Sequence, residues 1–215
     1  MKKEYVAIGV LLAINLIVTA VFVSILPDQV PIHFGKAGVA DRMGSKYMNF
    51  LVLALWLGIA ILSIWDAKTN DRGNSRSVLL LGVATQVFAV CFDVFIALNQ
   101  LAFNAEAASS LSFNMSQMSA IALGILLVIA GNLMPKTTMN STFGIRLPWS
   151  TKSDDIWQKT QRLCGYVSIV CGLVAIVCGI VVPVSESFTA IMIVMALWAM
   201  VCVGISYVVY KRERG

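Results

Sequence analysis

Charged residues are scarce in this 215-residue chain, and their scarcity excludes a water-soluble domain. Only 13% of the residues are Asp, Glu, Lys or Arg, whereas soluble domains carry about 25%. Hydrophobic residues make up 59% of the chain, and its mean hydropathy is +0.84. A soluble fold of this length could not bury so much apolar surface and would lack the polar groups that keep it dispersed. The composition therefore predicts an integral membrane protein.

Histidine occurs only once, and all five cysteines lie within apolar runs. Neither an extracytoplasmic disulfide framework nor a CxxC metal site is therefore predicted. Cys-Gly pairs recur every seven residues, at 164–165, 171–172 and 178–179. Residues seven apart on a helix are separated by about 10.5 Å, which is too far to share one ion. The repeat instead predicts a stripe of small residues that lets a neighbouring helix approach closely.

Six apolar runs are long enough to cross a bilayer, whose core of about 30 Å needs roughly 20 helical residues. The first run is too long for the apolar region of a signal peptide, and no Ala-x-Ala cleavage site follows it before Pro27. The chain is therefore predicted to be an all-α, polytopic bundle of six transmembrane helices. It forms a single domain over 1–215, with an N-terminal part (1–117) and a C-terminal part (118–215). The predicted spans are 5–26, 47–65, 78–98, 118–134, 163–184 and 188–210.

The basic residues predict the orientation in the membrane, because cytoplasmic loops retain Lys and Arg during insertion. With the N-terminus inside, thirteen of the sixteen basic residues lie in inner segments. Both termini are therefore predicted to be cytoplasmic. Attraction to anionic lipid headgroups explains the net charge of +5 without nucleic acid. The outer basic residues are Lys36, Arg42 and Lys46, and the inner ones are Lys2, Lys3, Lys68, Arg72, Arg76, Lys136, Arg146, Lys152, Lys159, Arg162, Lys211, Arg212 and Arg214.

The outer connection, 27–46, contains the only histidine together with two carboxylates, and its prolines and glycines predict a turn-rich loop. The candidate outer-face residues are Asp28, His33 and Asp41. One His and two Asp could bind zinc or act as acid and base in an extracytoplasmic hydrolase. No spacing places these groups on one face, so a hydrogen-bonding role for His33 within the loop is favoured.

Asp93 is the only charged residue inside a predicted span. A carboxylate in hydrocarbon is costly and faces the bundle interior, a partner or water. Asn99 lies only about 9 Å further along the axis, which favours contact of Asp93 with the outer interface. Gln86 and Asn15 could hydrogen-bond across helices, and Trp56 is expected to pack between them. A small transporter or channel using Asp93 and Gln86 is the alternative function, although no inverted pair of broken helices supports it.

The longest inner connection is 131–165, and its residues predict a helix end followed by a helix start. Pro135 ends the fourth helix, and Ser153 followed by two acids, or Thr151 with Asp154, is a good N-terminus. Beyond it, Ile156, Trp157 and Thr160 share a face from which the basic residues turn away. This pattern predicts a short amphipathic helix at the membrane surface before the fifth span.

Two stretches resemble the SdpI family of bacterial membrane proteins. The outer pattern Leu26-Pro27-Asp28 with His33 and Asp41 is similar to the N-terminal region of that family. Leu147 and Gln161 depart from the family pattern, which usually has Thr and His there, so no imidazole titrates at position 161. The inner stretch carries the family's signature at Asn132, Pro135, Lys136, Asn140, Gly144, Arg146, Pro148, Trp149, Trp157, Thr160 and Arg162.

The resemblance implies a non-enzymatic immunity protein in the bacterial cell membrane, with no metal and no cofactor. The best-known members protect the producing cell from the SdpC peptide toxin and hold a repressor, SdpR, at the membrane. The expected partners are thus membrane lipids, an SdpC-like toxin at Asp28, His33, Asp41 and Asp93, and an SdpR-like repressor at the inner signature, with no direct nucleic acid. In a structural alternative that can hold at the same time, Arg146 pairs with Asp154 or Asp155 and the tryptophans anchor at headgroups.

Overall fold

Six long helices form the body of the protein in a computed structural model that describes residues 2–35, 40–69, 75–104, 115–140 and 142–213. Each helix is long and apolar enough to cross a membrane, so the six predicted spans and the all-α membrane architecture are confirmed. The helices are α1 (Lys2–Ile25), α2 (Asn49–Thr69), α3 (Ser75–Asn104), α4 (Met115–Leu133), α5 (Asp154–Val181) and α6 (Val184–Arg212).

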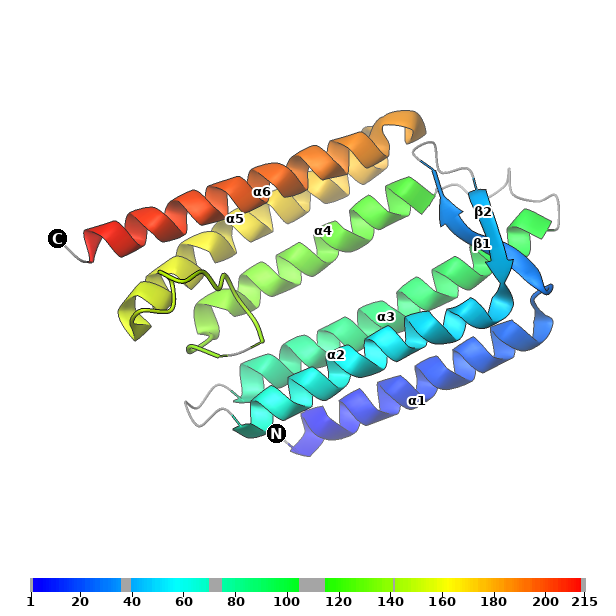
Figure 1. The fold of residues 1–215 in the computed structure, drawn as a ribbon, viewed down its shortest axis with the longest axis horizontal. Helices are drawn as coiled ribbons and strands as arrows, with labels where there is room; N and C mark the ends of the chain where they lie inside the picture. Colours follow the sequence, from blue (N-terminus) through cyan, green and yellow to red (C-terminus); the bar gives the residue numbers. More distant parts are fainter. Residues whose placement is uncertain (1, 36–39, 70–74, 105–114, 141, 214–215) are drawn as a thin grey trace.

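The helices are arranged as two groups of three (Figure 1). In the first group α3 packs against α1 and α2, and in the second α5 packs against α4 and α6. The two groups meet where α3 contacts α4. Each group buries its own apolar cluster, centred on Ile8 and Leu79 in the first and on Ala175 and Ile191 in the second.

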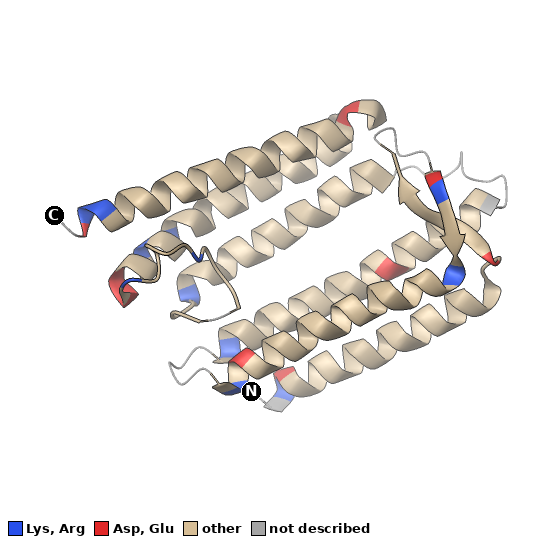
Figure 2. Cartoon of the chain, in the orientation of Figure 1, with Lys and Arg blue, Asp and Glu red and all other residues tan. Residues whose placement is uncertain are grey.

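Both ends of the chain lie at the same end of the bundle, and most of the Lys and Arg positions lie at that end (Figure 2). This arrangement is the one that the predicted orientation requires, because inner segments must share one side of the membrane. That this side is the cytoplasmic one stays a prediction. Lys36, Arg72 and Arg214 lie outside the described residues.

At the opposite end, the expected turn-rich loop is instead an antiparallel hairpin of β1 (Gln29–Phe34) and β2 (Ala40–Ser45). The hairpin is held on the bundle by α3, since Gln100 Nε2 donates to the carbonyl oxygen of Pro31 at 3.1 Å. Val30, a residue of β1, is fully buried. The apolar residues of β1 thus gain a partner surface, which a loop prediction from prolines and glycines could not take into account.

Glycines form the contact between α4 and α5. A Cβ atom on Gly172 would lie 2.6 Å from the carbonyl oxygen of Gly124, and one on Gly165 would lie 2.7 Å from that of Gly131. Contacts this short exclude any larger side chain, so the predicted small-residue stripe on the fifth span is confirmed. The partner glycines of α4, which are also seven residues apart, were not identified from the sequence.

The predicted helix start at Ser153 is confirmed, because its Oγ accepts a hydrogen bond from Ile156 N at 3.2 Å. The amphipathic segment that follows is not a separate interfacial helix. It forms the first turns of α5, which runs without a break to Val181. No proline or turn residue between Ser153 and the fifth span interrupts the backbone hydrogen bonds, so the helix continues into the membrane.

Candidate functional site

The inner connection, residues 131–165, includes the end of α4 and the first turns of α5, and we call it the signature loop. Its non-helical part is held to α5 by Gln161. The amide of this fully buried side chain donates from Nε2 to Ile145 O at 3.0 Å and accepts from Ile145 N at 2.9 Å. Beside it, Gly144 has a φ of +115°, a conformation that L side chains avoid. A Cβ atom there would lie 2.6 Å from Gln161 Oε1. Glycine at 144 and glutamine at 161 therefore form one anchor.

Asn140 builds the turn at the start of the loop. Its Oδ1 accepts from Phe143 N at 2.7 Å and from Thr142 N at 3.0 Å, while its Nδ2 donates to Thr138 O at 2.9 Å. An amide that bonds backbone groups on both sides imposes a local turn. The signature asparagine is thus a structural residue.

The two signature tryptophans are anchored inside the protein. Trp157 is fully buried and donates from Nε1 to Thr137 O at 3.0 Å. Trp149 donates from Nε1 to Ser206 Oγ at 3.0 Å, and its ring packs edge-on against Tyr207 with the centroids 5.8 Å apart. These contacts tie the signature loop to α5 and α6.

The signature therefore divides into two sets by burial. Asn140, Gly144, Trp149, Trp157 and Thr160 form the scaffold of the loop, and they are buried or half-buried. Thr160 is fully buried, and its Oγ1 has no hydrogen-bond partner within the described part of the chain. The other set is exposed in the structure; it consists of Asn132, Pro135, Lys136, Arg146, Pro148 and Arg162.

The outer-face candidates do not form one site. His33 Nδ1 lies 2.6 Å from Asp41 Oδ1 across the hairpin, with both side chains exposed, so the predicted hydrogen-bonding role of His33 is confirmed. Asp28 lies 3.2 Å from Lys46 Nζ instead. Among the described residues, no group of three or more His, Cys, Asp or Glu could hold a metal ion.

Asp93 lies apart from the hairpin candidates, in a polar cluster between α1, α2 and α3. Its Oδ2 accepts from Asn15 Nδ2 at 2.9 Å, and its Oδ1 accepts from Trp56 Nε1 at 3.0 Å. Gln86 Nε2 donates to the carbonyl oxygen of Trp56 at 3.1 Å, and the Trp56 ring packs edge-on against Phe88. Two donors from other helices therefore satisfy the Asp93 carboxylate within the bundle. Its contact with the outer interface stays a prediction, since the side chain is half-buried. The expected packing role of Trp56 is confirmed.

A double-mutant cycle tests this cluster. We expect Asp93→Leu and Asn15→Leu to show a coupling free energy of about 0.6 to 1.7 kcal/mol, which are the average and the maximum for interhelical hydrogen bonds in a membrane protein. The free energy of unfolding of the purified protein in detergent gives the value. The control cycle combines Asp93→Leu with His33→Leu on the hairpin. The changes that these two substitutions make in the free energy of unfolding should add. A coupling of zero between positions 93 and 15 would show that the hydrogen bond contributes nothing.

Sequence reasoning missed two residues of these sites. Gln161 was noted as a departure from the family pattern and not as an anchor of the loop, and Asn15 was not connected with Asp93. The available signal was weak in both cases, because a buried amide in a helix does not reveal from the sequence which backbone or side chain it meets.

Comparison with known proteins finds two matched regions in the chain. Residues 136–206 match the model of the SdpI/YfhL protein family, and residues 10–58 match a domain of unknown function, DUF1648. The whole chain is 23% identical over 216 residues to Immunity protein SdpI of Bacillus subtilis (strain 168), which covers 100% of this chain and 99% of that protein. No solved structure matches the chain. The predicted resemblance to the SdpI family is confirmed, and the chain is a multi-pass bacterial membrane protein.

Proposed function

From this resemblance to the SdpI family, we propose that the chain is a membrane immunity protein that protects a bacterial cell from a membrane-active, SdpC-like peptide toxin. The observation that carries the proposal is the similarity to an immunity protein along the full length of both chains. The outer hairpin falls within the matched region 10–58, and residues 136–165 of the signature loop fall within the matched region 136–206. Protection of this kind requires binding and not catalysis, so we propose no enzymatic step.

The toxin-facing surface in this proposal is the outer hairpin. Asp28, His33 and Asp41 are all exposed there, and the hairpin lies at the end of the bundle opposite the chain termini (Figure 1). We do not assign Asp93 to toxin binding, because both of its carboxylate oxygens already accept hydrogen bonds within the bundle.

The inner surface is proposed to dock a cytoplasmic partner, such as an SdpR-like repressor. The cations Lys136, Arg146 and Arg162 are exposed on this surface, and the buried residues of the signature loop hold the surface in shape. Signalling from the hairpin to this surface requires two conformations that the toxin binds unequally. The hairpin contacts α3, α3 contacts α4, and α4 leads into the signature loop, so this series of helices is the proposed physical connection between the two ends.

A toxin-challenge assay tests the proposal. We expect a strain sensitive to SdpC to survive when it expresses this chain. The variant His33→Ala should lower survival. The variant Arg146→Ala should retain survival but lose membrane recruitment of the repressor. Gly58→Ala is the folded control, since no atom lies within 4 Å of the added Cβ. If cells with verified membrane expression survive no better than cells with the empty vector, the SdpC-like assignment is rejected.

A further inference from the structure

Three sulfur-bearing side chains from three elements meet in one buried cluster, where the signature loop packs against α6. Met134 lies in the short turn η3 (Met134–Lys136), Cys164 in α5 and Cys202 in α6. Both cysteines are free thiols, and at most 3% of any of the three residues is exposed. The separation that keeps cysteines of one helix from sharing an ion does not apply here, because the two thiols belong to different helices.

The two thiols lie close together between α5 and α6. Cys164 Sγ donates a hydrogen bond to the carbonyl oxygen of Cys202 at 3.6 Å, and the two thiols also interact with each other. An S–H group is only a weak donor, so little stability is lost when a ligand takes the place of its proton.

The thioether of Met134 is held in place by Ser168. Ser168 Oγ lies 3.7 Å from Met134 Sδ and 2.8 Å from the carbonyl oxygen of Cys164, and it accepts from Trp198 Nε1 at 2.8 Å. The hydroxyl has a single proton to donate, and the carbonyl oxygen at the shorter distance is the better acceptor. The lone pairs of the Met134 sulfur therefore stay available to a ligand.

The chemistry of this sulfur cluster selects a soft, monovalent cation. Thiolate and thioether ligands favour Cu(I), whereas carboxylates, carbonyls and water suit hard cations. Structural zinc sites use four ligands, and the cluster supplies three sulfurs. Charge points the same way, because Cu⁺ forms a neutral pair with one thiolate. A divalent ion would need both thiols ionised side by side, and burial of charge is costly.

We infer that the sulfur cluster binds one Cu(I) ion through Met134, Cys164 and Cys202. On binding, one thiol S–H bond breaks, the proton leaves to the solvent, and the sulfur electron pair forms the Cu–S bond. Copper arrives as Cu(I) and stays Cu(I), so the step needs no oxidant or reductant. The inference goes beyond toxin immunity and does not depend on it.

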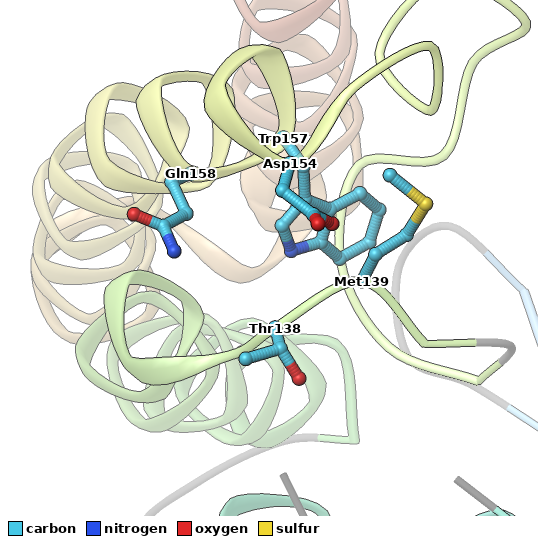
Figure 3. A pocket seen from close by; sticks show the side chains of 5 residues that line it. All are labelled: Thr138, Met139, Asp154, Trp157 and Gln158. Atoms are coloured by element: carbon cyan, nitrogen blue, oxygen red, sulfur yellow. The ribbon is translucent and has the colours of Figure 1, made fainter. Parts of the chain in front are cut away.

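The nearest route to the cluster from the inner end of the bundle is through the signature loop. Phe143 and Ile145 of this loop pack against the sulfur cluster. A cavity of about 340 Å³ opens between the loop and the first turns of α5 (Figure 3). Trp157 at this cavity precedes Cys164 by seven residues, which is about 10.5 Å along the helix axis. The cavity is lined by Thr138, Met139, Asp154, Trp157 and Gln158.

Competition with a coloured chelator, under anaerobic conditions, tests the inference. The probe is Cu(I) bound to bicinchoninate, titrated against the full chain in detergent micelles, and loss of the chelate's absorbance reports transfer to the protein. The background variant combines Cys91→Ser, Cys171→Ser and Cys178→Ser, which removes the other three thiols. We expect this background to take up one equivalent of Cu(I), and X-ray absorption at the copper edge to show coordination by sulfur alone.

Single substitutions in this background separate the cluster from its surroundings. Cys164→Ser, Cys202→Ser and Met134→Leu should each weaken Cu(I) binding by at least about tenfold, since loss of an outer-shell partner of a metal site already costs about 10- to 100-fold. Met134→Leu conserves volume, so it tests the site even if a serine variant fails to fold. The matched control is Met195→Leu, which packs against the Ala175 cluster instead and should bind Cu(I) like the background.

Thermal unfolding of each variant checks that the fold is intact. Unchanged Cu(I) binding in a folded Cys164→Ser, Cys202→Ser or Met134→Leu variant would overturn the inference. So would loss of uptake in the background variant, coordination by nitrogen or oxygen, or displacement of the bound Cu(I) by Zn(II). These outcomes are distinct from failure in the toxin challenge, because no toxin is present.

Discussion

Replacing Gly172 with leucine is expected to unpack the C-terminal three helices. A Cβ atom alone would lie 2.6 Å from Gly124 O and 2.8 Å from Val128 Cγ2, so a full leucine side chain forces α4 and α5 apart. Helices in a bilayer associate through close packing, because lipid removes the hydrophobic driving force between them. Overpacking a core costs about 1 to 3 kcal/mol, and we expect a loss at or above the upper end, because a helix backbone is the obstacle.

Unfolding of the purified protein in dodecyl maltoside, followed by circular dichroism during titration with SDS, measures this loss. The matched control is Gly204→Leu in α6, where a Cβ atom has no neighbour within 4 Å. The control should change the free energy of unfolding by no more than about 0.5 kcal/mol. If both variants lose stability equally, the effect comes from adding leucine to a helix and not from the contact between α4 and α5.

The second large effect is expected from Gln161→Leu, which should release the signature loop while the six helices remain folded. The substitution preserves the approximate shape of the side chain but leaves the backbone N–H and carbonyl of Ile145 without their partners. Each unsatisfied buried group costs about 1 to 3 kcal/mol. Opening of the loop should therefore become at least about tenfold more frequent, since 1.4 kcal/mol corresponds to a factor of ten.

Hydrogen–deuterium exchange followed by mass spectrometry measures this opening in peptides that cover 137–150. Gln29→Leu is the control, because it makes the same chemical change on the exposed edge of the outer hairpin. Exchange of the signature loop should be unchanged in that variant. Wild-type protection of 137–150 in Gln161→Leu would show that Asn140 and the tryptophans hold the loop without Gln161.

The membrane architecture could be predicted because its physical cause is local in the sequence. Hydrocarbon accepts only long apolar segments whose backbone groups bond internally, so the six spans are visible as uncharged runs. The stripe on α5 was predictable for a similar reason, since glycines at intervals of seven must lie on one side of a helix. Its partners, Gly124 and Gly131, were missed because a close contact depends on both helices, and only one of them carries the Cys-Gly repeat.

The roles of the polar residues could not be predicted from the sequence, because they depend on which groups the fold brings within about 3 Å. The sequence singles out Asp93 as a charge in an apolar span, but it does not show that Asn15 and Trp56 are its partners. Likewise, it does not show that Gln161 meets the backbone of Ile145. The hairpin likewise depends on a tertiary contact, since Gln100 near the end of α3 hydrogen-bonds to it.

The sequence by itself therefore determined that this chain spans a membrane six times and resembles one family. Only the tertiary structure decided which polar residues form the scaffold and which are exposed. The reason is that burial of apolar surface is additive along the chain, while a hydrogen bond requires a specific pair of groups that are distant in sequence.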